Sequence, residues 1–455
     1  MKARFTPALF AHAEAVLDQL LRFDHPADAV VSRYFREHRQ MGHADRAFVA
    51  ETVFAILRRG RSLEARCAGK LTHRHRLLVA LGVMRGWSLR ELAPVLNANE
   101  EAWLAAAKAM PEADMPPAVR CDLPDWLYER LLTQFSPEAI IELADGLNRP
   151  APLDLRVNTL KATRDSVLAA LSASGIAADA GKLSPVAIRL REKPALANHP
   201  LFLDGSVEVQ DEGSQLLGLV LEAKRGEMVV DFCAGAGGKT LLLGAQMRNT
   251  GRLYAFDVSE KRLTKLKPRL ARSGLSNVHP GRIEHERDSK IKRLSGKVDR
   301  VLVDAPCSGL GTLRRNPDLK WRQTPEGVLE LNQKQMSILG SAARLLKPGG
   351  RLVYATCSLL PQENQAIAED FLAKHPEFEV VPAAEALKPL FPKDKLPLGC
   401  SPDNPWWQLW PHIHGTDGFF GAVFQKKGVK PEKAEKPKSE KLTEDKPKRT
   451  EKALK

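Results

Sequence analysis

Cysteine is scarce in this chain, because its 455 residues contain only six, and no two of these form a Cys-x-x-Cys pair. The low count excludes a disulfide scaffold and the spacing lacks a zinc signature, so we predict no metal site. Long apolar runs are also missing, since none approaches the roughly 18 residues that a membrane-spanning helix needs. Pro7, Glu14 and Asp18 interrupt the N-terminal stretch where a secretory signal would lie. We therefore expect no membrane segment and a location in the reducing cytoplasm.

Acidic residues are too few to balance the basic ones, since 55 Asp and Glu stand against 69 Lys and Arg, a net charge of +14. Residues 426–455 are rich in Lys, Glu and Pro with almost no apolar content, so we expect a disordered tail there. The rest of the chain is still basic. A polyanionic partner, RNA or DNA, is the first candidate, and solubility alone is the alternative.

Hydrophobic periodicity divides the chain into three folded parts. Residues 1–120 show helical spacing throughout, which predicts a small all-helical domain. Four prolines between 111 and 124 mark a joint. Residues 125–205 mix strand and helix patterns, which predicts a small α+β module. From 206 to 425, short β-rich runs alternate with helical stretches, which predicts an α/β fold with a Rossmann-like, doubly wound parallel sheet. Ligands of such sheets bind beyond the carboxyl ends of the strands.

A glycine-rich loop, residues 231–240, follows the first strand of this predicted sheet and precedes a helix. A phosphate-binding P-loop would need glycine where Cys233 stands, and a dinucleotide fingerprint would need its third glycine where Thr240 stands. S-adenosylmethionine (SAM) has no pyrophosphate and needs neither. Asp257, at the end of the next strand, suits the ribose hydroxyls of such a nucleoside. A plain tight turn is the alternative for the glycines.

Two cysteines follow later strands of the same sheet. Cys307 lies three residues after Asp304, and Cys357 follows the next strand in the chain. Most free cysteines are buried packing residues, but two at equivalent strand ends suit methylation of cytosine at C5. A thiolate adds to C6, C5 becomes an enamine carbon that attacks the methyl group, and a carboxyl group near N3 assists. A base then removes the C5 proton and the sulfur leaves.

Residues 125–425 resemble the NOL1/NOP2/Sun (Fmu) family of RNA 5-methylcytosine methyltransferases, since they contain six motifs that occur in the same order in that family. The motifs are LRVNTLK (155–161), VQDEGSQL (209–216), DFCAGAGGKT (231–240), DAPCSGLGTLRRNPDLKW (304–321), LLKPGGRLVYATCSLLPQEN (345–364) and HGTDGFF (414–420). The segment DRAFVAETVFAILR (45–58) also resembles the NusB-like N-terminal domain of the bacterial small-subunit rRNA enzymes of this family.

The resemblance implies roles for the matching residues. Cys357 would be the nucleophile, Cys307 would assist product release, and Asp304 would contact the cytosine. The residues implied to line the SAM pocket are Cys233, Ala234, Gly235, Ala236, Gly237, Gly238, Lys239, Asp257, Asp288 and Asp304. The family has proline where this chain has Ala236, and we expect the loss of that proline to loosen the loop and weaken SAM affinity.

The same resemblance makes residues 1–120 and 125–205 candidate RNA-binding parts. Arg314, Arg315 and Lys320 follow the first cysteine motif and are predicted to contact phosphates. The basic stretch 261–269 is a second candidate, or a solvated helix face. The preferred substrate is small-subunit (16S) rRNA. The alternatives are tRNA, a non-catalytic RNA-binding assembly factor, and an NAD-dependent oxidoreductase that Thr240 disfavours. The sequence does not indicate an oligomeric state.

Overall fold

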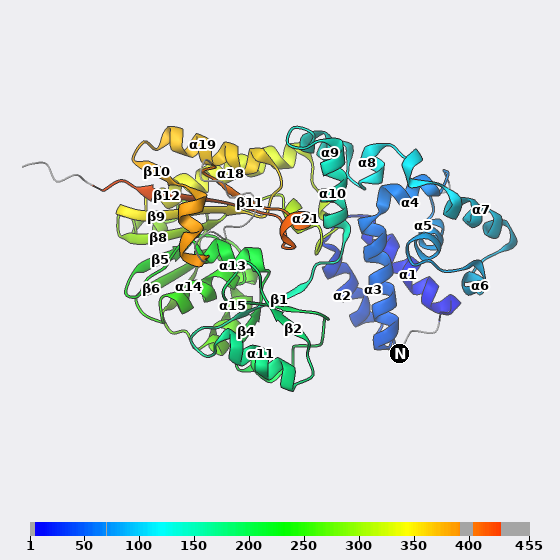
Figure 1. Ribbon diagram of the computed structural model, residues 1–455, viewed down its shortest axis with the longest axis horizontal. Helices are drawn as coiled ribbons and strands as arrows, with labels where there is room; N and C mark the ends of the chain where they lie inside the picture. The colour runs from blue at the N-terminus through cyan, green and yellow to red at the C-terminus, as the bar shows by residue number, and fades with distance from the viewer. Residues whose placement is uncertain (1–4, 70, 392–403, 429–455) are drawn as a thin grey trace, which may run out of the picture.

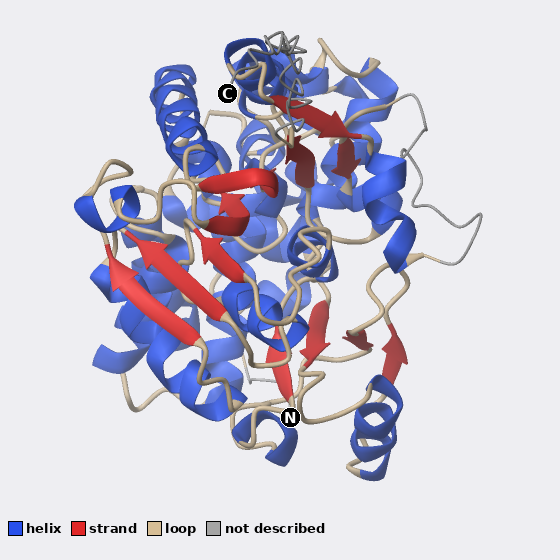
Figure 2. Cartoon of the chain, turned by 90° about the vertical axis from the view of Figure 1, so that its left-hand side faces the viewer, coloured by secondary structure: helices blue, strands red, loops and turns tan. Residues whose placement is uncertain are grey.

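The computed structural model describes residues 5–69, 71–391 and 404–428, so the predicted disordered tail lies, except for its first three residues, outside the described part. A helical domain lies at one end of the molecule and the large sheet at the other (Figure 1). The small α+β module lies beside the large sheet. Helices cover both faces of that sheet, as the view turned by 90° shows (Figure 2).

The N-terminal domain is all-helical, as its periodicity predicts. Its α-helices are α1 (Pro7–Leu20), α2 (Ala27–Glu37), α3 (His43–Arg58), α4 (Gly60–Arg66), α5 (His73–Val79), α6 (Leu89–Leu92) and α7 (Ala98–Ala109). Val16 and Leu17 of α1 and Val49 and Val53 of α3 are fully buried in its core. Ser88 caps α6 in a capping box with Glu91. Apolar spacing and cap residues therefore account for this domain locally.

Three further helices, α8 (Pro117–Arg120), α9 (Asp125–Leu131) and α10 (Pro137–Asn148), connect this domain to the rest. Their apolar faces share a core with side chains that follow the two cysteine motifs. Those side chains include Leu310 and Leu359, both fully buried. The connecting helices therefore pack directly against the segments that carry the cysteines.

The small module is an antiparallel sheet of order β2-β3-β1-β4. Its elements are β1 (Leu153–Val157), α11 (Arg164–Ala173), β2 (Ala178–Ala180), β3 (Ala187–Leu190), α12 (Pro200–Leu203) and β4 (Val207–Val209). The predicted strand and helix at its start are present. β4, which lies just beyond the expected boundary at residue 205, pairs with β1 of this module.

The large sheet has the strand order β10-β12-β9-β8-β5-β6-β7, with β11 paired to β12. Its strands are β5 (Met228–Asp231), β6 (Arg252–Asp257), β7 (Val278–Arg282), β8 (Val298–Asp304), β9 (Leu346–Thr356), β10 (Phe378–Val381), β11 (Trp407–Leu409) and β12 (Phe419–Lys426). The α-helices between and around them are α13 (Glu212–Leu219), α14 (Gly238–Gln246), α15 (Glu260–Ser273), α16 (Ser289–Lys292), α17 (Leu319–Arg322), α18 (Pro325–Ala343), α19 (Gln365–Lys374), α20 (Ala383–Leu387) and α21 (Pro411–His414).

The five strands from β9 to β7 in this order are parallel, whereas β12 and β10 run antiparallel to their neighbours. The predicted Rossmann-like sheet is confirmed. The central strands are continuous apolar runs, such as Val301 to Val303, because both faces of the sheet are covered. The carboxyl ends of β5, β6, β8 and β9 therefore meet at one edge, and their last residues are Asp231, Asp257, Asp304 and Thr356.

Candidate active site

The glycine-rich loop between β5 and α14 lies tightly against the end of β6. Gly235 has a φ of +55°, and its N–H donates a 2.8 Å hydrogen bond to Oδ2 of Asp257. Gly237 has a φ of +83°, and a Cβ there would lie 2.1 Å from a methyl group of Leu266. Both glycines are in the left-handed region, which other residues enter at a cost. The loop thus requires glycine at these positions and orients an amide toward the carboxylate at the strand end.

Asp231 lies beneath this loop and is almost fully buried. Thr240 donates a 2.7 Å hydrogen bond to its Oδ2, while its Oδ1 has no partner among the described residues. Burial raises the pKa of Asp231 to about 7. A buried acceptor without a donor is costly, which agrees with the raised pKa of Asp231.

These features fit the SAM pocket that the resemblance implies. The carboxylate of Asp257 can accept from ribose hydroxyls, and a Cβ at Gly235 would have no neighbour within 4 Å, so the loop is open there. Ala234 is buried, Cys233 is half-buried, and the carbonyl of Ala236 accepts from Arg269. Asp288 caps the short helix α16, since its carboxylate accepts from the N–H groups of Glu284 and Lys290.

Lys239, in the first turn of α14, forms an ion pair with Asp304 at the end of β8, with 2.7 Å between Nζ and Oδ2. Burial would lower the pKa of Lys239, but the Asp304 carboxylate outweighs it, and the pKa is raised. Lys239 is therefore a cation at neutral pH. A negative charge on Cys357 interacts favourably with it as well. The Lys239 ammonium group therefore interacts favourably with both the Asp304 carboxylate and a negative charge on Cys357.

The two predicted catalytic cysteines meet at this edge. Their sulfur atoms lie 3.4 Å apart, and both cysteines are free and partly exposed. The hydrogen bond with Cys357, together with burial, raises the pKa of Cys307 well above its usual value. Cys307 is therefore a thiol at neutral pH. The structure brings together Cys307, Cys357, Asp304 and Lys239, as the sequence predicts.

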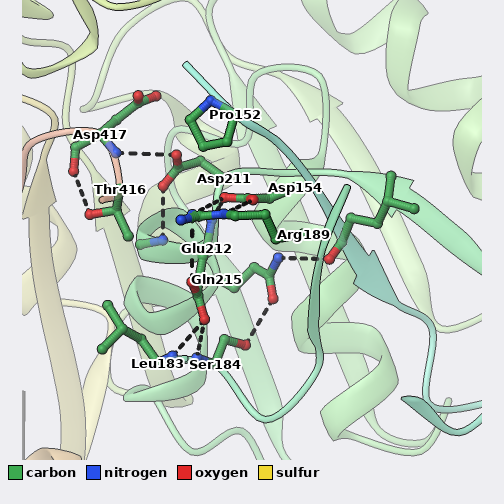
Figure 3. A network of polar contacts seen from close by, with 12 residues as sticks. Pro152, Asp154, Leu183, Ser184, Arg189, Asp211, Glu212, Gln215, Thr416 and Asp417 are labelled. Atoms are coloured by element: carbon green, nitrogen blue, oxygen red, sulfur yellow. Dashed lines mark hydrogen bonds and ion pairs between the residues drawn. The ribbon is translucent and has the colours of Figure 1, made fainter. Parts of the chain in front are cut away.

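Arg315 belongs to a buried network that joins the module to the large sheet. It forms ion pairs with Asp211 at 2.9 Å and Asp417 at 2.6 Å. The N–H of Asp417 also donates to Asp211 at 3.1 Å (Figure 3). In the same network Arg189 of β3 makes two hydrogen bonds to Asp154 of β1 (Figure 3). Although the Arg315 side chain is 32% exposed, its guanidinium neutralises two buried carboxylates.

The burial of Arg314 and Lys320 contradicts the prediction that their side chains contact phosphates. Arg314 is 6% exposed and donates to the carbonyl of Thr416 at 2.7 Å. Lys320 is 1% exposed and donates to the carbonyl of Arg58 at 2.7 Å and to Asn148 at 3.1 Å. A side chain so buried does not reach a phosphate. Both residues were predicted from their place beside the cysteine motif, and the helical domain covers that place.

The helical domain is docked on the segment that follows Cys307. The indole N–H of Trp321 donates to the carbonyl of Leu57 at 2.8 Å, and the N–H of Ala27 donates to Asp318 at 3.3 Å. Arg58 donates to the carbonyl of Arg314 at 3.2 Å. These contacts tie the ends of α2 and α3 to residues 314–321.

Two residues of the site were not singled out in the sequence. Asp231 begins the glycine-rich motif, and its only signal is a carboxylate at the end of an apolar strand. Glu363 lies behind the two cysteines and is fully buried. The sequence around Glu363 also gives little indication of a site residue, because Pro-Gln-Glu-Asn (361–364) is typical of a surface turn.

Among the described residues, no helix is long and apolar enough to cross a membrane. Nor does the described part of the chain group three or more His, Cys, Asp or Glu side chains as a metal site would. A parallel sheet with a glycine loop and an acidic residue at the end of the next strand is a nucleoside-binding arrangement. Thr240 in place of the third dinucleotide glycine, and two cysteines at the same edge, make it that of a SAM-dependent methyltransferase.

Comparisons with known proteins agree with this class. The family model described as 16S rRNA methyltransferase RsmB/F matches residues 218–425, and that of the RsmF/B-like ferredoxin-like domain matches residues 123–197. A probable ribosomal RNA small subunit methyltransferase B from Synechocystis is 31% identical over 90% of this chain and 98% of its own length. One from Bacillus subtilis is 34% identical over 67% of this chain and 66% of its own length. The crystal structure of PH0851 matches with a TM-score of 0.74 and 28% identity, covering 94% of this chain and 100% of that one.

The chain therefore belongs to the RsmB/F family of methyltransferases.

Proposed function

We propose that this protein transfers the methyl group of SAM to C5 of a cytosine in small-subunit rRNA through a covalent bond between Cys357 and C6. The observation that carries the proposal is the pair of sulfur atoms 3.4 Å apart, at the sheet edge that also holds the glycine loop and Asp304. Methylation of an exocyclic amine would need no thiol at this edge.

Cys357 starts the reaction. C5 of cytosine is too weak a nucleophile to attack a methyl sulfonium directly, so the thiolate of Cys357 first adds to C6 and makes C5 an enamine carbon. SAM would be held by the glycine loop and Asp257 and would supply the electrophilic methyl group, leaving as S-adenosylhomocysteine. Lys239 lies where a negative charge on Cys357 interacts favourably with its ammonium group.

Asp304 and Cys307 act on the cytosine and on the adduct. Asp304 contacts the cytosine, and a proton on its carboxyl group would be donated toward N3, where electron density rises as the sulfur adds. After transfer, a base removes the proton from C5, the bond between sulfur and C6 breaks, and Cys357 leaves as a thiolate. Cys307 assists this release. The hydrogen bond with Cys357 and burial raise the pKa of Cys307 and keep it protonated at neutral pH.

The substrate is proposed from the names of the relatives, which are small-subunit rRNA methyltransferases. The net charge of +14 supports a polyanionic substrate, and the place of action would then be the cytoplasm. The target cytosine has to be unpaired or flipped out, since a base inside a helix cannot reach a sulfur at the sheet edge.

The test measures transfer of labelled methyl groups from SAM to size-fractionated, unmodified cellular RNA. The wild type should label small-subunit rRNA, and Cys357→Ala should not. Cys307→Ala should accumulate a covalent protein–RNA adduct that survives a denaturing gel. The matched control is Cys67→Ala, a buried cysteine of the helical domain, which should transfer label like the wild type.

Three results would contradict parts of the proposal. Label in the tRNA fraction alone would overturn the substrate. An adduct with Cys357→Ala but not with Cys307→Ala would reverse the roles of the two cysteines. SAM binding without label in any RNA fraction would favour the non-catalytic assembly factor.

A further inference from the structure

A single buried carboxylate holds the two cysteine segments together. Glu363 is 0% exposed, and its Oε1 accepts from the backbone N–H of Ser308 at 2.8 Å. Its Oε2 accepts from the hydroxyl of Ser308 and from the hydroxyl of Ser358. Ser308 directly follows Cys307, and Ser358 directly follows Cys357. The carboxylate therefore bonds to the neighbour of each catalytic sulfur.

Further contacts make this arrangement rigid. The two serine hydroxyls are 3.2 Å apart, and Gln335 donates to Oε1 of Glu363 at 3.1 Å. Gln335 also donates to the carbonyl of Pro306 at 3.0 Å, on the other side of Cys307. The hydroxyl of Tyr354, on β9, donates to the carbonyl of Glu363 at 2.6 Å. The segment of Cys307 is thus held on both sides, and the backbone of Glu363 is anchored to β9.

Hydrogen-bond donors surround the Glu363 carboxyl group. Among the described residues no lysine, arginine or histidine forms an ion pair with it. A carboxylate has about four acceptor positions, and four donors occupy them here. A buried charge without a counter-ion needs all of its hydrogen bonds, so each serine is required at its place. With every acceptor position used and no exposed surface, Glu363 does not take a proton from a substrate.

We infer that Glu363 is a positioning residue that sets the distance between the two catalytic sulfurs through Ser308 and Ser358. The inference rests on the proposed function for its catalytic consequence, but the distance itself can be measured without RNA. Covalent catalysis needs the adding thiolate within a few tenths of an ångström of its place, and a displacement of about 1 Å costs about 10²-fold in rate.

The experiment compares Glu363→Gln, Ser358→Ala and the matched control Glu100→Gln. Glutamine has the size of glutamate but replaces one acceptor oxygen by an NH2 donor. Whichever way the amide turns, one pair of donors loses its acceptor, either the two serine hydroxyls or the N–H of Ser308 and Gln335. Glu100 is also a buried carboxylate, 6% exposed, but it pairs with Arg74 in the helical domain. It therefore controls for the general effect of removing a buried charge.

The first readout is the rate at which the oxidant diamide joins Cys307 and Cys357 in a disulfide. Diamide takes up the two electrons and two protons that the two thiols lose. Mass spectrometry of the linked peptides gives this rate. We expect the rate to fall at least about tenfold in Glu363→Gln and in Ser358→Ala, and to stay unchanged in Glu100→Gln. This readout does not depend on which RNA is methylated.

The second readout is methyl transfer and SAM binding. We expect kcat to fall about 10²-fold in Glu363→Gln, with the Kd for SAM within a factor of two of the wild type. The inference is overturned if Glu363→Gln and Ser358→Ala both keep the wild-type cross-linking rate and the wild-type kcat. It is also overturned if Glu100→Gln loses cross-linking rate and kcat to the same extent as those two variants. If Glu363→Gln does not fold, Ser358→Ala decides alone, since it removes one hydroxyl and no charge. A slower cross-link with no methylated RNA in the wild type would reject the proposed function and keep the positioning role.

Discussion

Lys239 and Asp304 come from two different strand-to-helix connections and meet at 2.7 Å, with Cys357 close enough for its charge to affect the lysine. The lysine follows the glycine loop and the aspartate ends β8. The ion pair therefore links the part of the site that would hold SAM to the part that would hold the cytosine.

Replacing Lys239 by methionine should lower kcat by about 10² to 10³-fold, because a fixed charge that stabilises developing charge contributes on that order. Since the pKa of Lys239 is raised, the wild-type rate should show no loss of this cation up to pH 9. Steady-state kinetics with labelled SAM would measure both.

The control for this variant is Lys347→Met. Lys347 also pairs with an aspartate, Asp299, at 2.8 Å, but the pair lies at the opposite edge of the sheet. It should keep wild-type kinetics. A Lys239→Met enzyme with kcat within threefold of the wild type would contradict the role given to the ion pair.

Gly235→Ala should weaken SAM binding about fivefold. An added methyl group would meet no atom within 4 Å, so the effect comes from the left-handed backbone alone, which costs about 1 kcal/mol or more for alanine. Isothermal titration with SAM would measure it. Gly226→Ala is the matched control, since Gly226 has a φ of +79° and the same free space but lies before β5, away from the loop. Equal Kd values for SAM in both variants would contradict the prediction.

Lys320→Met should flatten the dependence of stability on pH. Burial lowers the pKa of Lys320 to about 7, below its unfolded value near 10.5. Between these values the unfolded chain binds more protons, so the free energy of unfolding of the wild type should rise with pH, by at most about 1.4 kcal/mol per pH unit. That increment is lost as pH falls toward 7. Urea unfolding at pH 7 and pH 9.5 should show this rise in the wild type and a smaller one in Lys320→Met. If the free energy of unfolding changed equally with pH in the wild type and in Lys320→Met, the role given to Lys320 would be wrong.

The exposed cations of α15 should contribute to RNA binding where Arg314 does not. Lys261 and Lys265 are exposed and form no ion pair with any described residue, whereas Arg269 on the same helix is paired with Glu208. Replacing both lysines by alanine should reduce the salt slope of RNA affinity by about 1.4, or 0.7 per phosphate contact on a single strand.

Filter binding from 50 to 200 mM salt would measure that slope. Lys374→Ala, on α19, is the control and should leave it unchanged. An unchanged slope in the double variant would leave α15 as a solvated helix face.

The sheet edge could be predicted from the sequence because each strand is a short apolar run that ends in a marked residue. Asp231, Asp257 and Asp304 each follow such a run, and parallel strands bring their ends together. The pairing of Cys307 with Cys357 follows from the same rule, since β8 and β9 are neighbours.

The fate of the basic residues could not be predicted in this way. Arg314 and Lys320 lie beside a catalytic motif in sequence, but their burial depends on α3, which ends more than 250 residues earlier. Glu363 was missed for a similar reason. Its neighbours in sequence are polar, and only the turn after β9 brings it under the segment of Cys307.

The docking of Trp321 and Lys320 on the end of α3 also has a consequence for the order of synthesis. The carbonyl of Arg58 receives its donor from a residue 262 positions later. At roughly 5–20 residues per second, a ribosome adds those residues in about 13 to 50 seconds. The helical domain is complete once α7 ends at Ala109, 211 residues before Lys320, so for about 10 to 40 seconds of that interval water alone occupies the surface that residues 314–321 later cover. The nascent chain thus presents a folded domain with a temporary bare face, and a chaperone or a ribosomal surface has tens of seconds in which to bind it.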